Sequence, residues 1–142
     1  MSVGLLIIFT AIVVGDYLYI DGGEISHMED GTMPNRTNPS HAISHTLSIP
    51  LGVSWDNQTV DFNKIPKPSS VPILNNQAAW RDPSGSGFYI RGGVTPYHAQ
   101  PLPSDMWKFT TDGSGGGFWA KEKRVSSVAL SRNIRTTHGA WT

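Results

Sequence analysis

The sequence predicts an all-β protein of short strands and many turns. Glycine and proline account for 15 and 10 of the 142 residues, and charged residues for only 15%, a composition that favours strands and turns over helices. No long stretch shows the 3.6-residue hydrophobic period of an amphipathic helix. An internal repeat adds to this. At residues 11–23 and 79–93 an apolar start, a turn, an aromatic-rich strand and Ile-X-Gly-Gly follow one another, which is typical of a β-repeat architecture.

The first repeat unit is expected to span residues 10–63. Gly15-Asp16 favours a tight hairpin turn between its first two strands. Gly22 and Gly23 end this hairpin, because glycine allows the positive φ that a sharp exit from a strand requires. The polar stretch 24–40 that follows is predicted to be an extended loop. The expected strands of this unit are Thr10–Val14, Tyr17–Ile20, His45–Ile49 and Thr59–Phe62.

The second repeat unit is expected to span residues 74–123, with Gly92 and Gly93 as its double glycine. Residues 64–73, which separate the two units, are rich in proline. They are predicted to be a linker, since each proline removes a hydrogen-bond donor that a central strand needs. The expected strands of the second unit are Gln77–Arg81, Phe88–Arg91, Asp105–Phe109 and Phe118–Lys121.

The two ends of the chain are expected to lie outside the complete units. Residues 1–9 are interpreted as an apolar segment left from a targeting sequence; a signal-peptide core is the open alternative, although no Lys or Arg precedes it. The apolar run is too short to span a bilayer, which takes about 20 residues, so no membrane span is expected. Residues 124–142 are predicted to start a third unit, because His138–Thr142 is similar to Gln77–Arg81.

Aromatic residues mark both units. Trp55 and Trp119 each follow a double glycine at a distance, and with Trp107 they are interpreted as structural residues of the repeat. Most of the aromatic side chains are expected to pack between sheets, where alternate strand positions are buried, and not to stack on carbohydrate. This set comprises Tyr17, Tyr19, Trp55, Phe88, Tyr89, Trp107 and Trp119.

The spacing of the double glycines and tryptophans resembles the kelch repeat of β-propellers. Segments 15–24, 74–77, 88–93 and 105–110 are similar to a group of fungal kelch-like proteins that are secreted or anchored by one membrane helix. The resemblance covers most of the chain from Ala11 onward. It implies a partial kelch-type propeller with two blades plus the start of a third, each blade being a four-stranded sheet. It also implies an extracellular or cell-surface location.

The resemblance implies a non-catalytic interaction module that binds a protein or a glycan through rim loops, residues 24–44 and 94–104. Two blades cannot close a ring, so we expect a fragment of a larger propeller whose open blade faces self-associate or aggregate. Two alternatives stay open. One is a fragment of an extracellular propeller enzyme similar to galactose oxidase, with its active residues in missing blades. The other is a non-functional truncated product.

The residue pattern predicts no catalytic residue, cofactor or metal. The copper site of galactose oxidase needs a cysteine, and the chain has none. Asp21 and Glu24 flank the first double glycine as cation ligands would, but the second unit has Arg91 and Val94 there. No histidine is expected to have a ligand role, and His27 and His98 are expected in the loops after the double glycines; the other histidines are His41, His45 and His138.

Two further features complete the prediction. Asp112–Gly117 is predicted to be a hairpin loop, because it lacks the Lys-Ser/Thr pair of a phosphate-binding loop. Asn35 and Asn57 begin Asn-X-Thr triplets, which accept N-glycans if the chain is secreted. The formal net charge is zero, which argues against nucleic acid as a partner.

Overall fold

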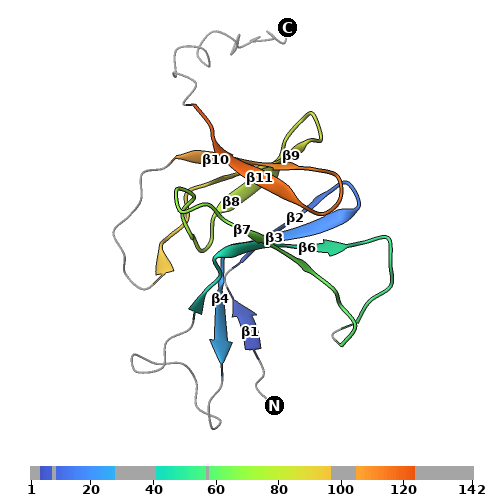
Figure 1. Ribbon diagram of the computed structural model, residues 1–142. Helices are drawn as coiled ribbons and strands as arrows, with labels where there is room; N and C mark the ends of the chain where they lie inside the picture. Colours follow the sequence, from blue (N-terminus) through green and yellow to red (C-terminus); the bar gives the residue numbers. More distant parts are fainter. Residues whose placement is uncertain (1–3, 8, 28–40, 57, 97–104, 124–142) are drawn as a thin grey trace, which may run out of the picture.

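The computed structural model describes residues 4–7, 9–27, 41–56, 58–96 and 105–123. These residues form three antiparallel sheets (Figure 1), which confirms the all-β class. Two of the sheets have four strands each and lie one above the other. A smaller sheet projects below them in this view.

The two larger sheets are antiparallel; the second is a simple meander, whereas in the first two strands of the small sheet come between its second and third strands in the chain. The first sheet has the order β2-β3-β6-β7, and the second sheet has the order β8-β9-β10-β11. The strands of the first sheet are β2 (Thr10–Val14), β3 (Tyr17–Asp21), β6 (His45–Pro50) and β7 (Asn63–Pro66). The strands of the second sheet are β8 (Ala78–Arg81), β9 (Gly87–Arg91), β10 (Met106–Thr111) and β11 (Gly117–Lys121).

Seven of these eight strands lie where the sequence predicts them; the exception is β7. The predicted strand at Thr59–Phe62 is wrong, and the strand forms at Asn63–Pro66 instead. Asp56 explains the shift, because its carboxylate accepts hydrogen bonds from the backbone N–H groups of Gln58 and Thr59 at 2.8 Å and so holds a turn. These bonds also lower the pKa of Asp56. Since β7 is an edge strand, the proline at its end is tolerated, and residues 64–66 belong to the sheet and not to a linker.

The small sheet was not predicted. Its strands are β1 (Gly4–Ile7), β4 (Glu24–His27) and β5 (His41–Ala42), with β4 in the middle. The prediction of a loop throughout residues 24–40 is therefore wrong for 24–27. The backbone of Ile25 pairs with Leu6 on one side and with His41 on the other. The apolar N-terminal segment thus provides a strand partner for the residues after the first double glycine.

The register shows that the two large sheets repeat one pattern. Ile20 lies between Ala11 and Leu47, and Ile90 lies between Ala79 and Trp107. The equivalence therefore extends over three strands and joins positions with similar apolar side chains.

The fourth strands match as well. Lys64 pairs with Leu47, and Lys121 pairs with Trp107, so Phe62 is the counterpart of Trp119 by register. The sequences Phe62-Asn63-Lys64 and Trp119-Ala120-Lys121 agree with this alignment. The tryptophan that the sequence pairs with Trp119, Trp55, lies outside the strands and is 44% exposed.

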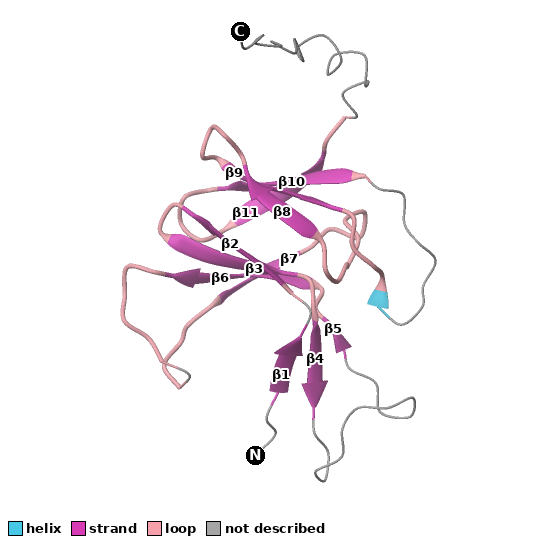
Figure 2. Ribbon diagram, turned by 180° about the vertical axis from the view of Figure 1, so that it is seen from behind, coloured by secondary structure: helices cyan, strands magenta, loops and turns pink. Residues whose placement is uncertain are grey.

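The two sheets lie face to face (Figure 2), and the faces that meet are unlike. Residues two apart on a strand share a face. The first sheet contributes the face that carries Tyr19, whose ring centroid lies 5.8 Å from Phe88 and 5.3 Å from Phe109. The counterpart of Tyr19 in the second sheet is Tyr89, which points away from this interface because it is the neighbour of Phe88. The second sheet is therefore stacked on the first with the same side up. In a sandwich of two like faces, Tyr19 and Tyr89 would both point into the interface, and here they do not.

The core between the sheets is aromatic. Trp119 meets Phe88 and Phe109 edge-on, at centroid distances of 5.6 and 5.2 Å. Aromatic pairs prefer this edge-to-face arrangement. The Tyr19 hydroxyl bonds Thr111 across the interface at 2.8 Å, and burial raises the pKa of Tyr19. The prediction of core packing is wrong for Trp55, and also for Tyr89, which lies on the face turned away from the core. The buried apolar cluster comprises Val14, Tyr19, Val71, Phe88, Ile90, Trp107, Phe109 and Trp119.

The turn before β9 has a pH-dependent ion pair. Asp82 lies 2.6 Å from Lys108 and accepts further hydrogen bonds from Ser84 and Ser86. The bond from Lys108 holds the pKa of Asp82 well below its usual range, and the same bond raises the pKa of Lys108.

We expect this carboxylate to contribute stability that is present above the ordinary aspartate pKa, about 3.9, and is lost as the pH falls below it. An Asp82→Asn variant should therefore lose less unfolding free energy than the wild type between about pH 5 and pH 2, because it has no charge to lose there. Urea titrations across that range measure the difference. Equal losses in the two proteins would show that the ion pair contributes nothing.

Candidate functional site

Both double glycines lie against one short segment, Leu74–Gln77. At Gly22, where φ is +71°, a Cβ atom would overlap the carbonyl oxygen of Leu74. At Gly93, where φ is +93°, a Cβ would lie 2.6 Å from the carbonyl oxygen of Asn75. Asn75 and Val94 also exchange two backbone hydrogen bonds, of 2.8 and 2.9 Å. The double glycines thus serve backbone geometry where the two sheets join.

A buried ion pair lies at the same junction. Asp21, directly before the first double glycine, is 2.8 Å from the Lys67 ammonium, and the two side chains are only 1% and 2% exposed. Thr46 donates to the other carboxylate oxygen at 2.8 Å, and Gln77 donates at 2.5 Å to the oxygen that Lys67 binds. Trp119 completes this group, which we call the Asp21 cluster, because its indole N–H donates to Thr46 at 3.0 Å.

The Asp21 cluster joins the two units of the repeat. Thr46 and Asp21 come from the first sheet, Trp119 comes from the second, and Lys67 and Gln77 come from the connection between them. The Lys67 ammonium lies 5.2 Å from the Trp119 ring centroid, so the cation also interacts with the ring. A buried charge needs such partners, since burying it alone is very costly.

The arrangement does not favour a cation held by Asp21 and Glu24. Asp21 is surrounded by donors, and Glu24 accepts a hydrogen bond from the Asn75 amide at 2.6 Å. An ammonium, a hydroxyl and two amide N–H groups already bind three of the four carboxylate oxygens that would coordinate a metal ion. Among the residues that the structure describes, no three His, Cys, Asp or Glu side chains are grouped to hold a metal.

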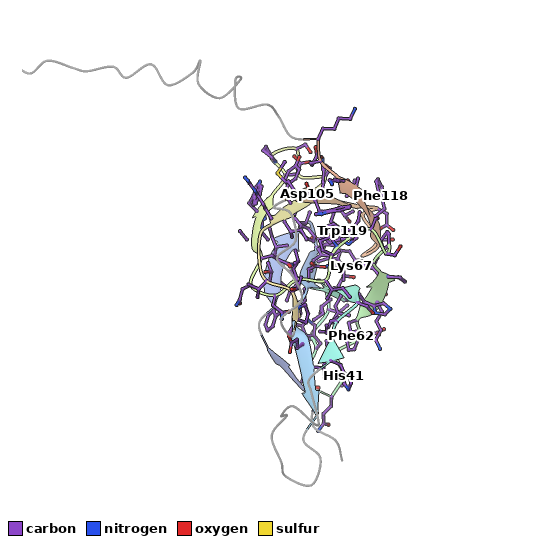
Figure 3. The ribbon with its side chains drawn as sticks, turned by 90° about the vertical axis from the view of Figure 1, so that its left-hand side faces the viewer. His41, Phe62, Lys67, Asp105, Phe118 and Trp119 are labelled. Atoms are coloured by element: carbon purple, nitrogen blue, oxygen red, sulfur yellow. The ribbon has the colours of Figure 1, made fainter. Side chains whose placement is uncertain are left out.

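A first pocket, of about 280 Å³, lies between the first sheet and β5. His41 and His45 both line it, together with Leu47, Phe62 and Lys64. The two histidines are brought together by the bend between β5 and β6 and not by a helix. The Lys64 ammonium lies 5.6 Å from the centre of the Phe62 ring, so the pocket combines an apolar floor with nitrogen-bearing side chains. Figure 3 shows His41 and Phe62 near one another, below Lys67.

A second pocket, of about 560 Å³, adjoins the first. Its wall is formed by prolines, and the Lys67 stem also contributes to it. Ser44 lines both pockets, and its hydroxyl is 3.1 Å from His45 Nδ1. The prolines are Pro68, Pro72 and Pro96.

The two pockets are built partly from the loops that the sequence proposes as a binding surface. His41–Ser44 belong to the loop after the first double glycine, and Thr95 and Pro96 to the loop after the second. Prolines of the connection between the sheets complete the second pocket, and no sequence signal pointed to them. Residues 28–40 and 97–104 of the two loops lie outside the described residues.

The remaining predicted residues fall into three groups. Trp107 and Trp119 are buried in the core at 8% exposure. The loop at Asp112 is a closed hydrogen-bonded turn, in which the N–H groups of Ser114 and Gly116 donate to the Asp112 carboxylate; these bonds lower its pKa. The residues outside the described part of the chain are Asn35, Asn57, His98 and His138, together with the side chain of His27.

Comparison with known proteins adds no relative. No family model, no curated protein and no solved structure matches this chain. Within the described ranges, no helix is long and apolar enough to cross a membrane. Function must therefore be argued from the rim and the faces of the sheets.

Proposed function

We propose that the chain is a non-catalytic interaction module of kelch-type propeller architecture, which binds a protein or a glycan at the rim that carries the double glycines. One observation carries this proposal: two adjoining pockets share Ser44 and draw residues from the loops after both double glycines. Pockets with an apolar lining and a few polar groups are the usual form of a binding site. Binding loops also gather at the ends of sheets, where rigid strands hold them.

The propeller architecture is supported by the sheets themselves. Each unit is a four-stranded antiparallel sheet whose strands follow the order of the chain, and the two units stack in the same sense with an equivalent register. That is the arrangement of successive propeller blades. We place such a module outside the cell or at its surface, with Asn35 and Asn57 as its acceptor sites for N-glycans. The alternative, a fragment of a propeller enzyme similar to galactose oxidase, has no specific observation in its favour.

The experiment is a binding screen with a blocking variant. The 142-residue chain would be probed with an array of cell-surface glycans and with a displayed peptide library. Ser44→Trp would fill the rim where both pockets meet, so the affinity for any captured ligand should fall at least about tenfold, or 1.4 kcal/mol. Ser54→Trp is the matched control, because Ser54 is exposed and lines neither pocket. Binding that Ser44→Trp leaves unchanged, or no binding in either library, would contradict the proposal.

A further inference from the structure

Each large sheet has one face in the interface and one face turned away from it. The outer face of the first sheet carries Leu18, Ile20, Leu47, Ile49 and Phe62. By register these positions correspond to Phe88, Ile90, Trp107, Phe109 and Trp119, which form the buried side of the second sheet. The outer face of the first sheet is therefore an apolar copy of a surface that already packs against a sheet in this molecule.

The outer face of the second sheet is the matching half. It carries Trp80, Tyr89 and Lys108, whose counterparts in the first sheet are Ile12, Tyr19 and Ser48. Those counterparts lie on the side of the first sheet that packs against the second.

Large aromatic side chains are exposed on both outer faces. Phe62 is 41% exposed on the first sheet, and Phe118 and Trp80 are 62% and 40% exposed on the second. Trp80 stacks on Tyr89 at 5.8 Å, and Lys108 lies 5.3 Å from the Tyr89 ring centroid. Clusters of exposed large apolar side chains of this kind mark interaction surfaces.

We infer that the outer face of the second sheet docks on the outer face of the first sheet of another copy of this chain. This contact would repeat the interface between the two sheets inside the molecule. There, Tyr19 packs against Phe88 and Phe109. In the contact between copies, Tyr89 would pack in the same way against Leu18 and Ile49. The sequence predicts self-association only in general terms, and the geometry assigns it to these two faces. Like the proposed function, this inference rests on the equivalence of the two four-stranded sheets, but it requires no ligand at the rim.

Because the two faces differ, the contact is heterologous. A heterologous contact leaves one face free at each end of a dimer, so further copies add until a ring closes or a chain forms. A face that paired with its own kind would stop at the dimer. Assembly beyond the dimer therefore distinguishes this contact from the self-association of a single apolar patch.

The test uses one charge on each face. Phe62→Glu blocks the first sheet and Phe118→Glu blocks the second, and both positions are exposed enough for the fold to tolerate them. Sedimentation velocity should show wild-type species larger than a dimer that grow with concentration. Each variant alone should be a monomer, and an equimolar mixture should form a heterodimer and nothing larger, since one intact face remains on each partner. Trp55→Glu is the control and should assemble like the wild type, because Trp55 belongs to neither face.

Three outcomes would overturn the inference: a monomeric wild type, single variants that still form dimers with themselves, or a mixture that stays monomeric. Lys64→Glu and Trp80→Glu repeat the design at neighbouring positions if either phenylalanine variant fails to fold, as checked by its thermal unfolding. Phe62 also lines the first pocket, so the Phe118→Glu variant, whose position lines neither pocket, separates the two results: it should lose assembly and keep rim binding.

Discussion

Replacing Gly22 by alanine should lower the free energy of unfolding by about 2–5 kcal/mol, whereas the same change at Gly92 should cost only about 1–2 kcal/mol. The two glycines hold equivalent positions with φ of +71° and +70°, so both variants have the cost of a left-handed alanine, about 1–2 kcal/mol. Only at Gly22 does the new Cβ also meet a backbone carbonyl, that of Leu74; relieving such an overlap costs about 1–3 kcal/mol more. At Gly92, apart from its chain neighbours, no atom of the described residues lies within 4 Å of that Cβ.

Urea unfolding of the two variants beside the wild type measures this difference. The Gly22 variant should unfold at a clearly lower midpoint than the Gly92 variant, with a similar dependence on urea. Equal losses would mean that the segment Leu74–Gln77 does not press on the first double glycine, and that the junction between the sheets is looser than described.

Replacing Lys67 by methionine should lower the free energy of unfolding by about 3–5 kcal/mol, which is the cost of leaving one partner of a buried ion pair uncompensated. Asp21 would keep its bonds from Thr46 and Gln77 but lose the charge that balances it. The contact of the Lys67 ammonium with the Trp119 ring would be lost as well.

Lys121→Met is the matched control. Lys121 is 56% exposed and pairs with Asp105 at 2.7 Å, and exposed pairs contribute only about 0–1 kcal/mol. Chemical unfolding of both variants gives the comparison. If Lys67→Met is no more destabilising than Lys121→Met, the Asp21 cluster does not join the sheets.

The strands were predictable because their signals are local. Alternating apolar residues and turn-forming glycines lie within a few residues of one another in β2, β3, β9 and β10. The strand at residues 59–62 was misplaced because the carboxylate of Asp56 holds a turn there. The alternation of apolar residues, on which a strand prediction rests, contains no information on such a hydrogen bond. The small sheet was missed because its strand pairs join segments far apart in the chain, and polar composition alone suggested a loop.

The site was less predictable than the strands. The sequence attributed a structural role to the double glycines, but it could not identify Leu74–Gln77 as the segment they meet. Trp55 was matched to Trp119 by distance along the chain, whereas the register matches Phe62, because the loop before β7 is longer than the one before β11. Asp21 and Lys67 are far apart in the chain, and no sequence pattern indicates that they pair. Only the folded structure shows this ion pair.

The measurement that tests the central claim most directly is a set of distances between aromatic rings across the two sheets. The claim is that the sheets stack through unlike faces. In a nuclear Overhauser experiment on the Phe62→Glu/Phe118→Glu double variant, which should be monomeric, the Tyr19 ring should show contacts to Phe88 and Phe109, within the range of rings 5–6 Å apart. The Tyr89 ring should show none to Tyr19. Contacts between Tyr19 and Tyr89, with none from Tyr19 to Phe88 or Phe109, would mean that like faces meet, and would contradict both the propeller-type stacking and the assembly inferred from it.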